Sequence, residues 1–520
     1  MRLPILLPAF IVLTTLIISC QNEAKQTPVN PAEQLIPKPV SAVAGNSPFE
    51  LTDSASIRVI GEGPEPLRIA ELLAGRLRPA TGFKLPVGPA TDASVKGHIY
   101  LELKGDSSQK KEGYELHISA DAVRIKAARP AGLFYGIQTL LQLFPTAIEA
   151  PSKQSVAWNL PGMDIRDHPL YAWRGSMLDV ARHFFGVADV KRYIDLLSYY
   201  KMNLLHLHLS DDQGWRIEIK SWPNLTKQGG STAVGGGKGG FYTQEDYREL
   251  VRYAADRFIT IVPEIDMPGH TNAALASYPE LNCNDTATKL YTGTEVGFSS
   301  FCTKKDITYK FIDDVMGELT ALTPGPYLHI GGDESHATKK EDYIPFMSKV
   351  QEIVKKHGKM AIGWDEIALT TLQPGTIAQY WSDSANSKQA AKQGAKIMMS
   401  PAIKAYMDMQ YDSSSKLGQH WAAYIEVDSA YNWNPSTLVA GIGFENIAGI
   451  EAPLWTETIT TMDEIEYMVF PRLPGYAEIA WSPEKGRGWD EYKLRLGKHG
   501  LRMKAMGIDF YKSAKVPWVE

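Results

Sequence analysis

Short apolar runs with partial alternation follow the first 37 residues of the chain. β-Branched and aromatic residues at every second position are typical of strands with one buried face. An apolar stretch over residues 133–143 predicts a helix that stops before Pro145, because proline cannot continue a helix. We therefore predict a small α/β domain over residues 37–160, with an antiparallel sheet that includes strands over residues 98–103, 114–118 and 123–126.

From residue 161 onward, strand-like and amphipathic helical stretches alternate. This order is typical of parallel sheets, in which a helix connects each strand to the next. Eight repeats over about 330 residues match a (β/α)8 TIM barrel better than an open doubly wound sheet. We predict an α/β fold with such a barrel over residues 161–520, ending in a C-terminal helical segment. Its strands are expected to begin near Gly175, Asn203, Phe258, Tyr327, Lys359, Ile377, Lys396 and Gly449, and its clearest helices to span residues 187–201, 243–257, 306–322 and 341–357.

The N-terminal sequence is typical of an export signal. Residues 3–19 are almost entirely apolar, which suits a signal peptide and is slightly short for a spanning helix. The run Ile-Ile-Ser-Cys that ends at Cys20 resembles the lipobox of bacterial lipoproteins; an uncleaved anchor with an incidental cysteine is the alternative. We expect a signal peptide over residues 1–20, lipidation of Cys20 and a polar tether over residues 21–36. The protein is then an exported membrane lipoprotein on the periplasmic or cell-surface side.

Export changes how the other two cysteines are interpreted. Cys283 and Cys302 form an even pair, so a disulfide is expected, with two separately buried thiols as the alternative. Such a bond stabilises by roughly 3 kcal/mol when it closes a loop of this size. Neither cysteine has a metal-ligand spacing, and no zinc site is predicted.

Composition and charge exclude several classes of protein. Hydrophobic residues make up 44% and charged residues 22% of the chain, as in ordinary globular proteins rather than disordered or polytopic membrane proteins. The formal net charge is −5 and no block of like charge occurs, so no nucleic-acid partner is expected. Aromatic residues reach 10%, which suits a sugar-binding cleft, although a large core would also use them.

One predicted strand ends in the run His-Ile-Gly-Gly-Asp-Glu over residues 329–334. Two glycines admit close approach of a ligand, and an acid in a filled cleft can be tuned to act near neutral pH. The alternative is that Asp333 and Glu334 only favour the N-terminus of the next helix through its dipole.

Two further predicted strands end in acids and imidazoles, over residues 203–216 and 262–270. Alternation places His206 and His208 on the same face of one strand, so a metal-dependent barrel hydrolase is a rival hypothesis. We favour packing inside the barrel with satisfied ring nitrogens, and we predict no metal and no cofactor.

Together these segments resemble glycoside hydrolase family 20, the β-N-acetylhexosaminidases. The resemblance extends from about Pro37 to Trp481 and rests chiefly on the Gly-Gly-Asp-Glu run. The other matching segments are residues 174–183, 205–216 and 263–270, with residues 132–140 in the N-terminal domain.

The resemblance implies an exo-acting, retaining hydrolase of glycans that end in N-acetylglucosamine or N-acetylgalactosamine. Glu334 matches the acid/base, and the substrate's own 2-acetamido oxygen is the nucleophile, through an oxazolinium intermediate. Asp333 matches the residue that orients the acetamido N–H, and Tyr406 matches a donor to its oxygen. Asp211 and His270 match a polar relay behind the acid/base, while Asp212 and Glu264 are expected to be structural partners.

The resemblance also implies a binding pocket. Trp364, Trp381 and Trp455 match tryptophans that box the acetamido methyl group. Arg182 matches the arginine that grips the 3- and 4-hydroxyls, where a fork of donors suits adjacent hydroxyls. The remaining matches are Asp408 and Glu457, acceptors for the hydroxyls at positions 4 and 6. Trp421 is expected to line the cleft near the leaving group.

Two departures concern the rim of the cleft. The Gly-rich tract over residues 229–240 is either a mobile loop over the barrel mouth or a plain flexible insertion, and His336 has no assigned role. A glycan-binding protein that has lost turnover is a further hypothesis, which the chemically competent residues at every matched catalytic position argue against.

Overall fold

The computed structural model describes residues 31–45, 47–104 and 110–520. The expected signal peptide, the lipidation site Cys20 and most of the expected tether lie outside the described residues. The end of that tether was placed wrongly: Pro31–Gln34 is a short 3-10 helix (η1), and Leu35 and Ile36 are buried in the core. Across the described ranges, no helix is both long and apolar enough to cross a membrane.

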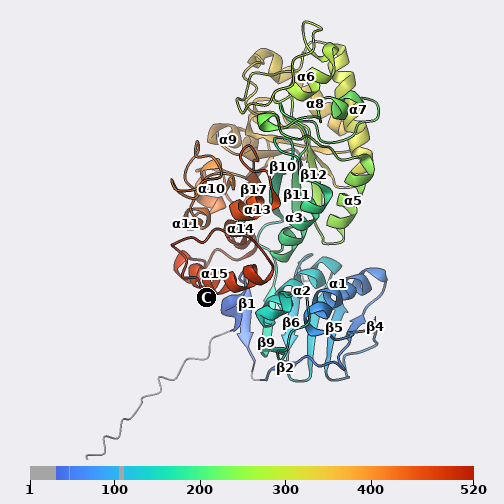
Figure 1. Ribbon diagram of the computed structural model, residues 1–520, viewed down its shortest axis with the longest axis vertical. Helices are drawn as coiled ribbons and strands as arrows, with labels where there is room; N and C mark the ends of the chain where they lie inside the picture. The colour runs from blue at the N-terminus through green and yellow to red at the C-terminus, as the bar shows by residue number, and fades with distance from the viewer. Residues whose placement is uncertain (1–30, 46, 105–109) are drawn as a thin grey trace, which may run out of the picture. The chain divides into compact units, whose positions relative to one another are not determined.

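A seven-stranded sheet forms the N-terminal part, in the order β1-β9-β6-β7-β5-β3-β4 (Figure 1). Its last strand in the sequence lies beyond residue 160, so the domain boundary falls later than predicted, between β9 and the barrel. The strands are β1 (Ser41–Ala44), β3 (Ile57–Ile60), β4 (Val87–Pro89), β5 (His98–Leu103), β6 (Tyr114–Ile118), β7 (Ala122–Ala127) and β9 (Met163–Asp167), with a separate pair, β2 (Phe49–Glu50) and β8 (Asn159–Leu160).

The sheet is mixed, and the prediction of an antiparallel sheet is right for only half of it. β6 pairs antiparallel with β7 and β9, and β1 with β9. β5 runs parallel to β7, and β3 runs parallel to both β4 and β5. The helix α1 (Pro64–Thr81) connects β3 to β4, and such crossovers make parallel neighbours. Alternation shows which face is buried, but it does not encode the direction of the partner strand.

The barrel prediction is confirmed. Eight strands form a closed parallel barrel in sequence order, and β10 and β17 close it. Each strand begins within two residues of its predicted start. They are β10 (Trp173–Asp179), β11 (Leu204–His208), β12 (Thr260–Glu264), β13 (Tyr327–His329), β14 (Met360–Trp364), β15 (Ile377–Tyr380), β16 (Lys396–Met399) and β17 (Ile447–Leu454).

Helices follow most of the strands. The longer ones are α2 (Pro130–Leu143), α3 (Val187–Tyr199), α5 (Gln244–Ala255), α7 (Asp306–Leu322), α8 (Lys340–Lys356), α9 (Ser384–Lys392), α13 (Met462–Val469), α14 (Arg472–Trp481) and α15 (Trp489–Ala505). After β14 the connection is only a 3-10 turn, η5 (Asp365–Leu369). The shorter helices are α4 (Asn224–Lys227), α6 (Asn272–Ser277), α10 (Ala402–Ala405), α11 (Val427–Tyr431), α12 (Pro435–Leu438), η2 (Thr146–Glu149), η3 (Val234–Gly236), η4 (Pro279–Leu281) and η6 (Phe444–Asn446).

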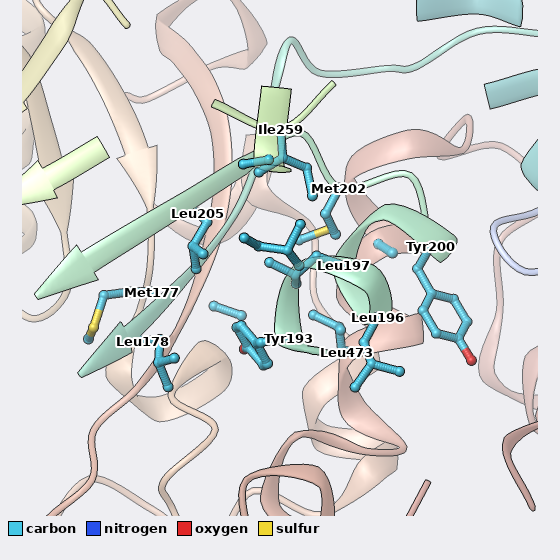
Figure 2. Packing of buried hydrophobic residues seen from close by; sticks show 14 of the residues in the cluster. Met177, Leu178, Tyr193, Leu196, Leu197, Tyr200, Met202, Leu205, Ile259 and Leu473 are labelled. Atoms are coloured by element: carbon cyan, nitrogen blue, oxygen red, sulfur yellow. The ribbon is translucent and has the colours of Figure 1, made fainter. Parts of the chain in front are cut away.

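Helix α3 shows how the helices cover the barrel. Its apolar residues recur at helical spacing, so that they lie on one face. Figure 2 shows Tyr193 and Leu197 on this face, beside Leu178 and Leu205 from the barrel strands, and all four are fully buried. The same pattern in the sequence therefore produces both the helix and its contact with the barrel.

One buried carboxylate joins the N-terminal sheet to the barrel. Asp167, at the end of β9, accepts hydrogen bonds from Lys201 Nζ at 2.9 Å and from Tyr114 Oη at 2.7 Å. The indole N–H of Trp481, on α14, donates to the same carboxylate at 2.9 Å. Because all four side chains are buried, these bonds fix the sheet against one end of the barrel.

Candidate active site

A cavity of about 280 Å³ opens at the carboxyl end of the barrel strands. In barrels of this type the loops after the strands carry the chemistry. Most of the predicted site residues line this cavity, and they come from loops after β10, β12, β13, β15, β16 and β17: Arg182, His270, Asp333, Glu334, Trp381, Tyr406, Asp408, Trp421, Trp455 and Glu457. Two predicted residues, Asp211 and Trp364, lie fully buried behind the wall.

The loop after β13 turns sharply to present the two acids. Gly331 and Gly332 have φ values of 60° and 106°, and Glu334 itself has φ 44°. A Cβ atom on Gly331 would lie 1.7 Å from Asp266 Oδ1, so only glycine fits there. Helix α8 begins only at Lys340, and therefore Asp333 and Glu334 do not lie in its first turn, as the helix-dipole alternative required.

His270 lies between the acids and a second carboxylate. Its Nδ1 is 3.2 Å from Asp211 Oδ1, and its Nε2 is 3.6 Å from Glu334 Oε2 and 3.7 Å from Asp333 Oδ2. Burial disfavours the imidazolium, but Asp211 and then Asp333 outweigh it and raise the pKa of His270 well above its usual value. The arrangement places a cation against Glu334.

The two adjacent acids, Asp333 and Glu334, have different electrostatic surroundings. Burial first, and then the neighbouring Asp266, raise the pKa of Asp333 well above its usual value. Burial also raises the pKa of Asp266, to about 7. Asp333 is nearly enclosed, whereas 30% of the Glu334 side chain is exposed in the cavity. A ligand that brings a positive charge to Asp333 would offset the cost of ionising it.

Arg182 is fixed by carboxylates on the side away from the cavity. Its Nη2 is 2.9 Å from Asp211 Oδ2, and its Nη1 is 3.5 Å from Asp179 Oδ2. Burial opposes the charge of Asp211, yet Arg182, His270 and a hydrogen bond from His208 hold the pKa of Asp211 far below its usual value. The guanidinium is thus oriented before any ligand binds.

Several buried polar atoms at this cavity have no hydrogen-bond partner within the described part of the chain. Buried polar atoms are rarely left unpaired, so such a set indicates a polar ligand. Asp408 and Glu457 each contribute one oxygen, and burial raises the pKa of both carboxyls. The full set at the cavity is Arg182 Nε, His270 Nε2, Asp333 Oδ1, Asp408 Oδ2 and Glu457 Oε2.

Aromatic rings form the other walls. Trp421 is 56% exposed and meets Trp381 and Tyr406 edge-on, at 6.2 and 6.0 Å between ring centroids. Trp455 lies 6.3 Å from Tyr406 and carries the Arg182 guanidinium on its face at 4.7 Å. Trp364 supports Trp455 from behind at 5.8 Å rather than lining the cavity. Apolar walls around a few polar groups are typical of sites that bind small molecules.

Both ring nitrogens of His206 and of His208 have hydrogen-bond partners inside the barrel, as the packing interpretation requires. His206 bonds Glu451 through Nδ1 at 2.8 Å and Glu264 through Nε2 at 3.0 Å. His208 bonds Glu264 and Asp211 through its two nitrogens. A metal ion at either imidazole would have to displace one of these bonds.

The expected disulfide between Cys283 and Cys302 is confirmed. The loop that it closes reaches the cavity through Thr294 and Val296. It is also bonded to the turn after Glu334, since Ala337 N donates to Gly297 O at 3.0 Å. Asp212, expected to be structural, accepts Asn272 N at 2.9 Å and Ser299 Oγ at 2.5 Å beside this loop.

The Gly-rich tract over residues 229–240 is held in place by a buried arginine. Arg216 donates from Nη1 to Gly230 O at 3.2 Å and to Gly240 O at 3.1 Å, and from Nη2 to Thr232 O at 2.8 Å. Val234 N donates to Arg182 O at 3.0 Å, which brings the tract beside the cavity. These bonds disagree with a plain flexible insertion.

Sequence reasoning missed several residues of the site. Asp179 holds Arg182 and also accepts Thr456 N at 3.1 Å. Glu366 accepts the indole N–H of Trp381 at 3.1 Å, and Gln419 lines the cavity. The only signal for Asp179 and Glu366 was their position at strand ends, which many structural acids share. His336 lines a separate cavity of about 220 Å³ with Glu334 and Glu366.

A (β/α)8 barrel whose mouth combines a carboxylic acid, aromatic walls and unpaired carboxylate oxygens fits a glycoside hydrolase. The sequence model of the glycosyl hydrolase family 20 catalytic domain matches residues 171–344 and 337–484, and that of domain 2 of the same family matches residues 32–168. The chain belongs to glycosyl hydrolase family 20.

Relatives and solved structures agree with this assignment. A β-N-acetylhexosaminidase of Cellulomonas fimi is 40% identical, over 94% of this chain and 98% of that protein. The family 20 β-N-acetylhexosaminidase of Streptomyces coelicolor A3(2) superposes with a TM-score of 0.91 at 50% identity, over 94% and 99% of the two chains. A mutant Streptomyces plicatus β-hexosaminidase, solved with the product GlcNAc, gives 0.91 at 50% identity, over 94% and 98%.

Proposed function

We propose that the protein is an exo-acting, retaining β-N-acetylhexosaminidase that removes terminal N-acetylglucosamine or N-acetylgalactosamine from glycans. The observation that carries the proposal is one cavity in which an acid, a buried carboxylate and a ring of unpaired polar atoms face the same small volume. A volume of about 280 Å³ suits a single terminal sugar, which favours exo action.

The chemistry begins with the substrate's own acetamido group. Its carbonyl oxygen attacks the anomeric carbon while Glu334 donates a proton to the glycosidic oxygen, and the aglycone leaves as an alcohol. Asp333 accepts the acetamido N–H and balances the positive charge of the oxazolinium ion. Tyr406 donates to the acetamido oxygen, and because burial raises the pKa of Tyr406 well above its usual value, it remains a donor. Glu334 then takes a proton from water, which opens the oxazolinium ring with a second inversion.

The surroundings of Glu334 support its double role. When Glu334 loses its proton, the His270 ring, held 3.6 Å away by Asp211, compensates the new negative charge. Arg182, Asp408 and Glu457 would bind the sugar hydroxyls, since each presents an unpaired buried atom. Trp381, Trp455 and, from behind, Trp364 would enclose the acetamido methyl group.

The direct test compares two aryl glycosides. The protein should cleave an aryl β-N-acetylglucosaminide and hardly cleave the matching aryl β-glucoside, which lacks the nucleophile. The first sugar product should be the β anomer by NMR, and a thiazoline mimic of the intermediate should bind much tighter than substrate. Chelators should leave the activity unchanged. Equal cleavage of both glycosides, or an adduct trapped on Asp333 or Asp211 by a fluorosugar, would contradict the mechanism.

We further propose that the protein is a lipid-anchored exported enzyme. The proposal rests on the lipobox-like run that ends at Cys20 and on the disulfide, which is typical of proteins outside the cytosol.

A further inference from the structure

Glu264 is a fully buried carboxylate with four polar partners beneath the candidate site. It lies at the end of β12 with 0% of its surface exposed. Its Oε1 accepts Trp364 Nε1 at 3.0 Å and lies 2.8 Å from His329 Nδ1. Its Oε2 bonds His206 Nε2 at 3.0 Å and, at shorter range, His208 Nδ1. Burial opposes its charge, but the three histidines hold the pKa of Glu264 well below its usual value.

His208 connects this carboxylate to the relay behind the acid/base. It is the residue paired with Glu264 in the register of β11 and β12, so both side chains enter the barrel at one level. Its Nε2 is 2.6 Å from Asp211 Oδ2. Because both ring nitrogens face carboxylates, both must carry protons. Burial opposes that charge, but Glu264 and Asp211 raise the pKa of His208 well above its usual value.

The same pair supports the tryptophan walls. Glu264 holds the indole N–H of Trp364, and the His208 ring meets Trp455 edge-on at 4.9 Å between centroids. Neither His208 nor Glu264 lines the cavity. Any effect of the pair on catalysis therefore acts through neighbouring residues, which include Asp211, the two tryptophans and His329.

We propose that His208 and Glu264 form a positioning pair that holds the acid/base relay and the acetamido pocket in register with each other. The inference rests on the proposed function, in which the acetamido oxygen must lie within attacking distance while Glu334 protonates the leaving group. Through Asp211 and His270 the pair sets the surroundings of Glu334, and through Trp364 and Trp455 it sets the pocket wall.

The physical basis is the cost of moving buried ions. An imidazolium and a carboxylate enclosed in the barrel are stable only while each remains paired. A shift of either one would carry its other partner with it. Displacement of reacting groups by about 1 Å can cost about 10²-fold in rate.

Two substitutions at one position separate the two halves of the pair. The amide nitrogen of asparagine occupies the place of Nδ1 of histidine, and that of glutamine the place of Nε2. His208→Asn thus keeps the donor to Glu264 and loses the donor to Asp211. His208→Gln keeps the donor to Asp211 and loses the donor to Glu264.

The two variants should show different kinetic defects. With His208→Asn we expect kcat to fall about 10²-fold on aryl glycosides with poor leaving groups, and much less on activated ones. The inhibition constant of the thiazoline should rise only slightly, because the ring contact with Trp455 is lost while Glu264 still holds Trp364. With His208→Gln we expect the inhibition constant of the thiazoline to rise about tenfold while the dependence on the leaving group stays as in the wild type. KM for the activated substrate should change little in His208→Asn.

Controls separate positioning from general damage to the fold. His499→Gln alters another buried histidine, which lies on α15 and bonds Tyr200 Oη at 2.9 Å. Neither residue lines the cavity, so this variant should leave kcat unchanged. Thermal unfolding and near-ultraviolet circular dichroism report folding of each variant. If neither His208 variant folds, Trp364→Phe removes the indole donor to Glu264 together with part of the ring behind Trp455, and it should raise the inhibition constant of the thiazoline.

The outcomes are distinct from those that test the proposed function. A wild type that does not cleave aryl β-N-acetylglucosaminide would overturn the proposed function itself. An active wild type whose His208 variants are folded and show either unchanged kinetics or the same pattern of losses would overturn the positioning pair alone. For Trp364→Phe, an unchanged inhibition constant would do the same.

Discussion

At the scale of single residues, Glu334 illustrates how backbone and charge together define a role. Its positive φ and the two glycines before it turn the carboxyl into the cavity, and His270 places a cation 3.6 Å away. The neighbouring Asp333 is held in a different environment, next to Asp266 and largely enclosed. Two adjacent acids in the sequence therefore have different surroundings, which is what different roles require.

Glu334→Gln removes the proton that the leaving group needs. We expect hydrolysis of substrates with poor leaving groups to fall by about 10²–10⁴-fold, and the first step on activated aryl glycosides to fall much less, because their leaving groups need little help. Steady-state and burst kinetics on a series of aryl glycosides measure this. Equal losses across the series in the first step would assign the acid to another residue.

His499 offers a prediction on pH. Burial, with Arg502 and Arg495 nearby, lowers the pKa of His499 to about 3, so the folded protein keeps this ring neutral. An unfolded histidine has a pKa near 6.5, and the unfolded state therefore binds more protons between the two values. The contribution of His499 to stability is complete above about pH 6.5 and is lost as the pH falls toward 3.

The stability of the His499→Gln variant should not show this decrease at low pH. Between pH 7 and pH 4.5 the wild type should lose about 2 kcal/mol more stability than His499→Gln, as measured by urea unfolding at the two pH values. A parallel decline of both proteins would show that His499 is already protonated in the folded state, or that its environment differs from the one described.

At the scale of elements, the loop between Cys283 and Cys302 combines stability with the shape of the cavity. It carries Val296, which lines the cavity, and its Ser300 Oγ lies 2.6 Å from Thr338 Oγ1 just beyond the acid/base turn. A covalent closure limits how far this loop can move in either the folded or the unfolded chain.

Cys302→Ser should therefore affect both properties. We expect a loss of roughly 3 kcal/mol in the free energy of unfolding, as the chain-entropy treatment gives for a loop of this length. KM for a substrate with a sugar aglycone should rise more than KM for a small aryl glycoside, because the loop lines the same cavity as the proposed acid Glu334. Reduction of the wild type with a thiol should reproduce both changes, and a reduced wild type that behaves as the oxidised one would contradict the prediction.

Elements were predicted to different degrees for physical reasons. The barrel strands were located within two residues because most of them are short, largely apolar runs bounded by polar loops, and the order of strand and helix then fixes parallel pairing. The direction of β5 was not predictable from alternation, and β9 was missed because it joins a sheet whose other strands lie far earlier in the chain. The tether was overextended because Leu35 and Ile36 are too short a run to stand out.

The residues of the site were also predicted to different degrees. The cavity-lining acids stand at strand ends, where pattern alone suggests chemistry, but their roles came from the family resemblance. The support of Trp364 behind Trp455 depends on packing between strands that the sequence does not display. The Gly-rich tract looked flexible because glycine permits many conformations, whereas the bonds of Arg216 to its carbonyls are long-range contacts.

At the scale of the molecule, the N-terminal sheet and the barrel share two ion pairs whose cations are buried. Arg174, at the start of the barrel, donates to Glu112 at 2.7 Å, as Lys201 does to Asp167 at 2.9 Å. Burial lowers the pKa of Lys201 although Asp167 opposes the shift. Removing one partner of a buried ion pair costs several kcal/mol of folding free energy. Because such a pair joins the sheet to the barrel, the two should unfold together.

We propose that the protein is held at a membrane through Cys20. If Cys20 is acylated, the folded part is connected to the membrane by the short segment before η1, and Cys20→Ala should move the protein from the membrane fraction to the soluble fraction. Several acyl chains anchor stably where one would not, and the apolar segment alone is slightly short for a permanent span. Fractionation with metabolic lipid labelling of both proteins measures this, and activity per mole should be equal because Cys20 lies far from the barrel in sequence. A variant that stays fully membrane-bound, beside a wild type without lipid label, would show that the apolar segment itself is the anchor.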